Sequence, residues 1–287
     1  MNPLANHPFL KMNGIGNAIV VVDLRGTKLN VTPQDARAIA RGDGLAYDQL
    51  MVLREPKRDG ADAFMTIFNN DGSESASCGN GTRCVAWALL RDSQYDHVLL
   101  ETSAGPLESW RNSERNFTVD MGPPRLEWRD IPLASAVADT RVVSLPDAAP
   151  EIAALGPFSA ASMGNPHAVF WVKDPDTIDL AKLGPALEHH SMFPQRANIS
   201  FAQVVSRQHI RLRVWERGAG ITQACGSAAC ATLVCAVRKE MTDRKATVSL
   251  PGGDLMIEWR PHDSHVLMTG AIELEFEGRF DPALFAS

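Results

Sequence analysis

The chain lacks the features that mark several large classes of protein. It has only 5 cysteines in 287 residues, and none of them forms a CxxC pair, so a structural zinc site is not expected. The N-terminus has no basic start followed by an apolar block, which argues against a secretory signal. The longest apolar run, Ala228–Val237, is well short of the roughly 18 residues of a membrane helix.

Charge and composition narrow the choice further. The net charge is -6, from 28 basic and 34 acidic side chains, whereas a nucleic-acid-binding protein is usually basic. A hydrophobic content of 45% is ordinary for a globular protein. An odd number of cysteines without an export signal indicates reduced thiols in a cytoplasmic protein. The length fits two domains.

The sequence repeats itself once. Gly16-Asn17 recurs as Gly164-Asn165, at 164 − 16 = 148 residues, and Cys78-Gly79 recurs as Cys225-Gly226, at 225 − 78 = 147. Four further landmarks recur in the same order with offsets of 147 to 149: Gln49 and Asn198, Phe68 and Trp215, Gly105 and Gly253, and Gly122 and Gly270. Such a series indicates two copies of one unit. We expect one domain over 1–123, with 272–287 packing back onto it, and a second over 124–271.

Each copy is predicted to contain several strands and one central helix that follows the Cys-Gly pair. The expected strands are Ile19–Asp23, Gln49–Leu53, Phe64–Phe68, His97–Glu101, Phe117–Met121, Ala168–Val172, Ile199–Val205, Ile210–Val214, Thr247–Leu250 and Leu255–Trp259. The expected helices are Thr82–Leu90, Ala228–Val237 and a surface helix over 33–41. This pattern predicts an α+β fold of two pseudo-symmetric domains, each a curled, mostly antiparallel sheet wrapped around its central helix. A doubly wound parallel sheet would need more helices between the strands.

Cys78 and Cys225 each stand at the entrance of a predicted helix, beside glycine. The free N–H groups and the positive end of the helix dipole stabilise a thiolate or a bound carboxylate there. A two-fold repeat would bring the two thiols to opposite faces of one ligand. One thiolate could then remove a proton from a carbon beside a carboxylate, and the other thiol could return a proton from the opposite face, which inverts the carbon.

Other interpretations of these residues stay open at this point. Cys84, Cys230 and Cys235 fall inside the apolar helices and are interpreted as core residues. His167 is equally consistent with a structural hydrogen bond and with a place near the site. Cys78 and Cys225 could instead form a functional disulfide, although redox pairs usually occur as CxxC. A non-catalytic binder of small amino acids could use the helix ends alone.

Six strings across nearly the whole chain resemble the diaminopimelate epimerase family. They are KMNGIGN (11–17), FNNDGSESASCGNGTRC (68–84), GNPHAV (164–169), FPQRANISF (193–201), ERGAGITQACGSAAC (216–230) and LPGGDL (250–255). The resemblance implies the diaminopimelate epimerase-like fold and a cofactor-independent enzyme that interconverts LL- and meso-diaminopimelate. It thus implies a place in lysine biosynthesis and in cell-wall precursor supply, and a homodimer as the assembly.

The resemblance also assigns roles to residues. It implies that Cys78 and Cys225 are the acid/base pair and that His167 and Glu216 tune the thiols. It implies that the substrate is bound by Asn17, Gln49, Asn69, Gly79, Asn80, Asn165, Asn198, Glu216, Arg217, Gly226 and Ser227. No metal, nucleic-acid or membrane partner is implied. A diamino dicarboxylate needs a carboxylate, a guanidinium and amides at its far end, and Glu216, Arg217 and the asparagines provide them.

Some positions depart from the family's pattern. Asn13 stands where histidine is common, Ala18-Ile19 replaces Asp-Phe, and Ile221 replaces glutamate. A racemase of proline or hydroxyproline on the same fold is the nearest rival function. Arg217 and the set of amides argue against it, because a compact cyclic substrate would leave these groups unpaired.

Overall fold

A computed structural model describes residues 2–75, 78–146 and 149–286 of the chain; residues 76 and 77, in the string before Cys78, lie outside it. The chain divides into two compact units, one formed by residues 1–120 with 269–287 and the other by residues 121–268. The boundaries expected from the sequence, after residues 123 and 271, each differ from these by three residues (123 − 120 and 271 − 268).

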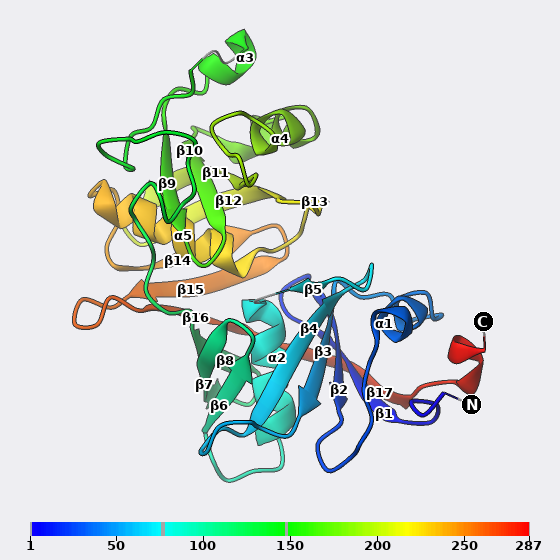
Figure 1. Cartoon of the computed structure of the whole chain (residues 1–287). Coiled ribbons are helices and arrows are strands. Elements are labelled where there is room, and N and C mark those ends of the chain that lie inside the picture. The colour runs from blue at the N-terminus through cyan, green and yellow to red at the C-terminus, as the bar shows by residue number, and fades with distance from the viewer. Residues whose placement is uncertain (1, 76–77, 147–148, 287) are drawn as a thin grey trace. The chain divides into compact units, whose positions relative to one another are not determined.

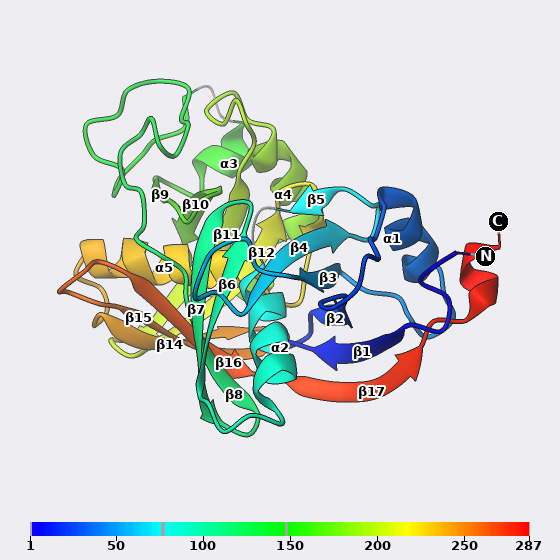
Figure 2. The ribbon, with the colours of Figure 1, turned by 60° about the horizontal axis from the view of Figure 1, so that its bottom comes forward.

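The first unit is a mixed sheet in the order β17-β1-β2-β3-β4-β6-β7-β8. Its strands are β1 (Pro8–Asn13), β2 (Ala18–Asp23), β3 (Gln49–Arg54), β4 (Ala63–Asn69), β5 (Glu74–Ser75), β6 (His97–Thr102), β7 (Gly105–Ser113), β8 (Asn116–Asp120) and β17 (Glu273–Arg279). The β2–β3 and β4–β6 pairs are parallel and the others are antiparallel. The C-terminal strand β17 runs beside β1, as Figure 2 shows.

Helix α2 (Gly79–Leu90) lies in the curl of this sheet, against β2, β6, β7 and β8 (Figure 1). Strands β2 and β3 are apolar on both faces, which explains their uninterrupted hydrophobic runs. Val21 and Met51 join the core around α2, whereas their neighbours Val20 and Leu50 join a second core under α1 (Pro33–Ala40). The second core is closed by the C-terminal 3-10 helix η2 (Pro282–Phe285).

The second unit has the same arrangement of strands, in the order β9-β10-β11-β12-β14-β15. Its strands are β9 (Phe158–Ser162), β10 (Pro166–Trp171), β11 (Asn198–Ser206), β12 (His209–Glu216), β13 (Gly220–Ile221), β14 (Lys245–Leu250) and β15 (Gly253–Trp259). Strand β16 (Val266–Ala271) begins in this unit and continues past its boundary into the first. The remaining elements are α3 (Pro150–Ala153), η1 (Pro175–Thr177), α4 (Leu180–Glu188) and α5 (Gly226–Arg238).

Helix α5 is the central helix of the second unit and packs against β9, β10, β11, β14 and β15. It is buried along almost its whole length, which confirms the expectation drawn from its all-apolar sequence. The other face of the sheet is covered by α4. Phe170 and Phe201 pack there with Leu180 and Leu187 of the helix.

The strand register confirms the repeat at the level of single residues. Ile19 pairs with Gln49 in the first unit, and His167 pairs with Asn198 in the second. The offsets are 167 − 19 = 148 and 198 − 49 = 149. The β4–β6 and β12–β14 pairs are parallel at matching places, and β5 and β13 occupy matching edges before the two cysteines.

All ten expected strands are present, but seven others were not expected: β1, β5, β7, β9, β13, β16 and β17. After Phe158, strand β9 (FSAAS) consists of small Ala and Ser residues that are not typical of strands, and β17 (ELEFEGR) is largely exposed and charged. Helix α4 was missed because glycine and proline stand inside it. Helix α2 begins at Gly79 rather than Thr82, because Cys78 caps the first turn and the glycines are helical.

One buried hydroxyl in α5 gives a test of this core. Among the described residues, the hydroxyl of Thr232 has no hydrogen-bond partner, and the side chain is fully buried. Thr232→Val keeps the shape and removes the unpaired group, so we expect the free energy of unfolding to rise by about 1 kcal/mol. Urea unfolding of both proteins measures this change.

Thr140 provides the matched control, because its buried hydroxyl donates to Leu126 O at 2.8 Å and accepts from Arg238 at 2.9 Å. Thr140→Val should lower the free energy of unfolding by about 1–3 kcal/mol. A destabilised Thr232→Val would show that the hydroxyl contributes to the core.

Candidate functional site

The first unit places Cys78 at the N-cap of α2. Its backbone is extended (φ -150°, ψ 96°), and its Sγ accepts a hydrogen bond from the Gly81 N–H at 3.3 Å. A Cβ on Gly81 would lie 2.6 Å from the sulfur of Met51, so the first turn has no room for a side chain there. The sulfur is half-buried and receives part of the positive end of the helix dipole.

Two amides from neighbouring strand ends reach Cys78. Gln49 Oε1 lies 3.4 Å and Asn17 Oδ1 3.8 Å from Sγ. Asp48 fixes the orientation of Asn17, because its Oδ2 accepts from Asn17 Nδ2 at 2.9 Å and from the Ala18 N–H at 2.8 Å. The carboxylate therefore turns the Asn17 carbonyl oxygen towards the sulfur.

The other predicted residues of the first unit lie at the same end of the sheet. Asn69 pairs with Gln49 across β3 and β4, and its amide donates to Ser73 Oγ at 3.0 Å. Asn80 is buried in the first turn of α2 and accepts from Arg83 at 3.1 Å. The structure thus brings Asn17, Gln49, Asn69, Gly79 and Asn80 to the turn that carries Cys78.

The second unit places Cys225 at the N-cap of α5, buried with 5% of its surface exposed. Burial raises the pKa of the Cys225 thiol well above its ordinary value, and the charge and hydrogen bond of Glu216 raise it further. Hydrogen bonds from Ser227 and from the Ala228 N–H act in the opposite direction. At neutral pH this sulfur therefore carries a proton.

A chain of hydrogen bonds runs from His167 to Cys225. His167 Nε2 lies 2.9 Å from Asn165 Oδ1, Asn165 Nδ2 donates to Ser227 Oγ at 3.2 Å, and Ser227 Oγ lies 3.6 Å from Cys225 Sγ. Since Asn165 presents an oxygen to the ring, His167 donates from Nε2. Ser227 accepts from Asn165, which leaves the hydroxyl hydrogen for the sulfur.

His167 is uncharged near neutral pH. The ring is fully buried, and burial, followed by the charge of Arg217, lowers the pKa of His167 to about 3. Among the described residues no partner for Nδ1 is found, so the ring is neutral with one unused acceptor. The structure thus supports a hydrogen-bonding role for His167 and not an acid/base role.

The predicted polar residues at the end of β12 differ in exposure. Arg217 is exposed, and its guanidinium donates to Gln195 O at 3.1 Å. Asn198 is buried with both ends of its amide engaged, donating to Pro166 O at 3.0 Å and accepting from the Arg217 N–H at 2.9 Å. Thr222 donates to Glu216, whose side chain is half-buried.

Each unit therefore assembles one half of the predicted site. The first gathers the residues around Cys78, and the second gathers Asn165, His167, Asn198, Glu216, Arg217, Gly226 and Ser227 around Cys225 and the end of β12. Sequence reasoning missed Asp48 and Glu188. The only sequence signal for Asp48 was its place directly before Gln49, at the start of a strand.

The positions that depart from the family's pattern have local partners of their own. Asn13 Oδ1 accepts from the Gly16 N–H at 2.7 Å and closes the 13–16 turn. Ile19 is fully buried in β2, and Ile221 is half-exposed in β13.

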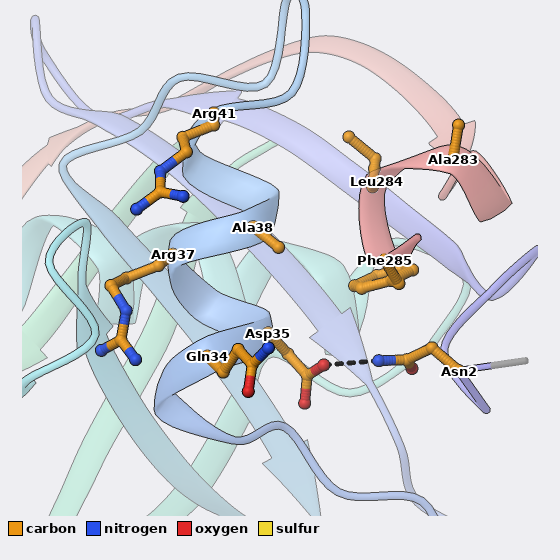
Figure 3. A pocket seen from close by; sticks show the side chains of 9 residues that line it. All are labelled: Asn2, Gln34, Asp35, Arg37, Ala38, Arg41, Ala283, Leu284 and Phe285. Carbon is orange, nitrogen blue, oxygen red and sulfur yellow. Dashed lines mark hydrogen bonds between the residues drawn. The ribbon is translucent and has the colours of Figure 1, made fainter. Parts of the chain in front are cut away.

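Metal-ligating clusters, membrane-spanning helices and pockets elsewhere in the described chain bear on other possible functions. Among residues 2–75, 78–146 and 149–286, no group of three His, Cys, Asp or Glu side chains could hold a metal ion. None of the helices described there is long and apolar enough to cross a membrane. A pocket between α1 and η2 is bordered by Asn2, Asp35, Arg37 and Leu284, with Asn2 bonded to Asp35 (Figure 3). It contains no predicted site residue.

Comparison with known sequences identifies one family. The profile of the family described as diaminopimelate epimerase matches residues 9–127 and 159–275. A relative named diaminopimelate epimerase from Afipia carboxidovorans is 56% identical over 288 residues, covering 100% of this chain and 99% of the relative. One of the same name from Methylocella silvestris is 57% identical over 286 residues, again covering 100% of this chain and 99% of the relative.

Solved structures share the fold at low sequence identity. A phenazine biosynthesis protein of the PhzF family from Enterococcus faecalis has a TM-score of 0.70 and 16% identity, covering 96% of this chain and 98% of its own. A hydroxyproline epimerase from Agrobacterium vitis, with bound trans-4-OH-L-proline, has a TM-score of 0.66 and 17% identity, covering 96% and 93%. These likenesses confirm the expected fold class.

The buried neutral His167 makes stability depend on pH. The unfolded chain protonates this ring below about pH 6.5, whereas the folded chain does so only near a pKa of about 3. The stabilisation is therefore complete above pH 6.5 and is lost as the pH falls through this window. His167 alone should lower the free energy of unfolding by about 2 kcal/mol between pH 6.5 and pH 5.

Urea unfolding of the wild type and of His167→Gln at pH 7 and pH 5 measures this effect. The variant should be less stable at pH 7 but should lose about 2 kcal/mol less on acidification. An equal loss in the two proteins would mean that another group causes the acid sensitivity.

Proposed function

Because the chain belongs to the diaminopimelate epimerase family, we propose that it interconverts LL- and meso-diaminopimelate with Cys78 and Cys225 as its two acid/base groups. Membership of this family shows the enzyme class: the protein is an isomerase of lysine biosynthesis. The cysteine mechanism is our proposal.

One observation supports this mechanism above the others. In each unit, a cysteine that follows matching strands is the N-cap of the buried central helix. Cys78 caps α2 and Cys225 caps α5, in backbone conformations that are both extended (φ -150° and -128°). The remaining cysteines, Cys84, Cys230 and Cys235, are fully buried inside the two helices. Burial raises the pKa of Cys84 and of Cys235 to about 12, which suits core residues.

In the proposed reaction the Cys78 thiolate removes the α-proton. The C–H bond breaks, an S–H bond forms, and the electron pair spreads from the α-carbon into the adjacent carboxylate. Cys225, which begins as the thiol, then donates its proton to the opposite face of the same carbon. The carbon ends inverted, Cys78 ends as the thiol and Cys225 as the thiolate, and the reverse reaction starts from that state.

Helix N-termini stabilise the charge that builds up on the reacting carboxylate. We assign its binding to the backbone N–H groups of Gly79 and Asn80 in α2 and of Gly226 and Ser227 in α5. These N–H groups belong to the first turn of each helix, where they have no intrahelical acceptor. Donors fixed by the fold need no reorganisation when the proton leaves.

The remaining predicted residues are assigned to substrate selection. Arg217 is exposed and can receive the distal carboxylate, and Glu216 offers a carboxylate to a distal ammonium group. Asn17, Gln49, Asn69, Asn165 and Asn198 complete the binding set. We place the enzyme in the cytoplasm as a homodimer, which agrees with its odd number of cysteines and with the family resemblance.

Cys78→Ala and Cys225→Ala should each lower kcat by at least about 10³-fold, because either change removes one of the two proton carriers. Incubation with LL-diaminopimelate in deuterated water measures this. The wild type should place solvent deuterium on the inverted α-carbon without added cofactor.

Cys230→Ala is the matched control, because it removes a buried thiol from α5 five residues beyond Cys225 (230 − 225 = 5). It should retain kcat within about threefold once the folded fraction is equal. Wild-type turnover by Cys78→Ala or Cys225→Ala would rule out the two-cysteine mechanism.

Mild oxidation tests whether the two thiols meet. A disulfide between Cys78 and Cys225 requires Cα atoms within about 7 Å, which only a shared site provides. We expect oxidation to abolish activity, peptide mapping to find the Cys78–Cys225 bond, and reductant to restore turnover. Full activity in a sample carrying this bond, or bonds formed only by other cysteines, would contradict the shared site.

A further inference from the structure

Glu188, at the C-terminal end of α4, is a buried carboxylate that the mechanism above does not use. Only 3% of the Glu188 side chain is exposed. The carboxylate is therefore buried beside a core that is otherwise apolar. A buried carboxylate is costly unless several hydrogen bonds compensate it. Its partners therefore indicate what it does.

Two hydrogen bonds tie Glu188 to the two sides of one loop. Oε2 accepts from the indole N–H of Trp215 at 2.7 Å, and Oε1 accepts from the Gly218 N–H at 3.0 Å. These two donors stand on either side of Glu216 and Arg217. The guanidinium of Arg196 lies 3.6 Å from Oε1 and partly balances the charge.

Packing fixes the same end of β12 against α4. A Cβ on Gly184 would lie 2.3 Å from the Trp215 ring, so the helix backbone touches the indole directly. Asn198 holds the Arg217 N–H, and Gln195 O holds the Arg217 guanidinium. The 216–220 loop is thus tied to the 188–198 segment at successive backbone positions.

We propose that Glu188 is a positioning residue that fixes the 216–220 loop and thereby sets where Glu216 and Arg217 meet the distal, non-reacting end of the substrate. This inference rests on the proposed function, because it assigns that end to Glu216 and Arg217. A distal contact is the same in the ground state and in the transition state, so its loss raises KM more than it lowers kcat.

Glu188→Gln is the test, because it keeps the volume but replaces one acceptor oxygen with an NH₂ group. Either Trp215 or Gly218 then loses its partner. We expect KM for diaminopimelate to rise about tenfold or more with kcat within about threefold, and amide exchange at Gly218 to accelerate about tenfold. Trp215→Phe removes only the indole donor, so we expect it to raise KM by a smaller factor. This variant provides the test if Glu188→Gln folds poorly.

Glu151→Gln is the matched control. It removes an exposed ion pair, at 2.5 Å, between Glu151 of α3 and Lys182 of α4, the helix that carries Glu188. KM and amide exchange at Gly218 should stay unchanged. A Glu188 variant with the KM of the wild type would overturn the proposal. So would a variant in which only kcat falls, and falls in proportion to the fraction of unfolded protein. Gly218 exchange needs no turnover, so failure of the cysteine mechanism remains distinguishable from failure of this inference.

Discussion

The structure depends on how a buried helix begins. The first N–H groups of a helix have no intrahelical acceptor, and inside a protein water cannot satisfy them. In α2 the sulfur of Cys78 accepts a hydrogen bond from the Gly81 N–H. The N–H groups of Gly79 and Asn80, in the same first turn, do not bond to this sulfur. Both curled sheets bury a helix of this kind, so the fold itself creates an electropositive position at Cys78 and another at Cys225.

Duplication supplies two equivalent scaffolds, and the side chains around them make the two thiols different. Gln49 corresponds to Asn198, Asn69 to Glu216 (216 − 69 = 147), and Ile19 to His167. Cys225 has the Glu216 carboxylate beside it, and that carboxylate helps raise the pKa of its thiol. The two thiols therefore stand in different surroundings: Cys78 faces the amide oxygens of Gln49 and Asn17, and Cys225 faces a carboxylate.

The sequence predicted the parts of the fold that have strong periodicity. The apolar runs of β2, β3 and α5 are buried on both faces, and such runs are visible without a structure. Strand β9 and helix α4 were invisible because tertiary packing overrides weak local preference: Ala and Ser are buried in β9, and Gly184 is required by Trp215. The sequence repeat was informative even where these elements were missed. It located the two cysteines without any assignment of the elements between them.

The sequence pointed to the residues that we propose to contact a ligand, and not to the residues that orient them. Cys78, Asn17 and Arg217 stand in recognisable strings, whereas Asp48 and Glu188 matter because of what they turn or hold. Asp48 directs the Asn17 oxygen to a sulfur, and Glu188 anchors both sides of Arg217. A flexible arginine or amide gains specificity only when such partners remove its alternatives. The accuracy of this site is therefore a property of buried acceptors that a linear reading of the chain does not reveal.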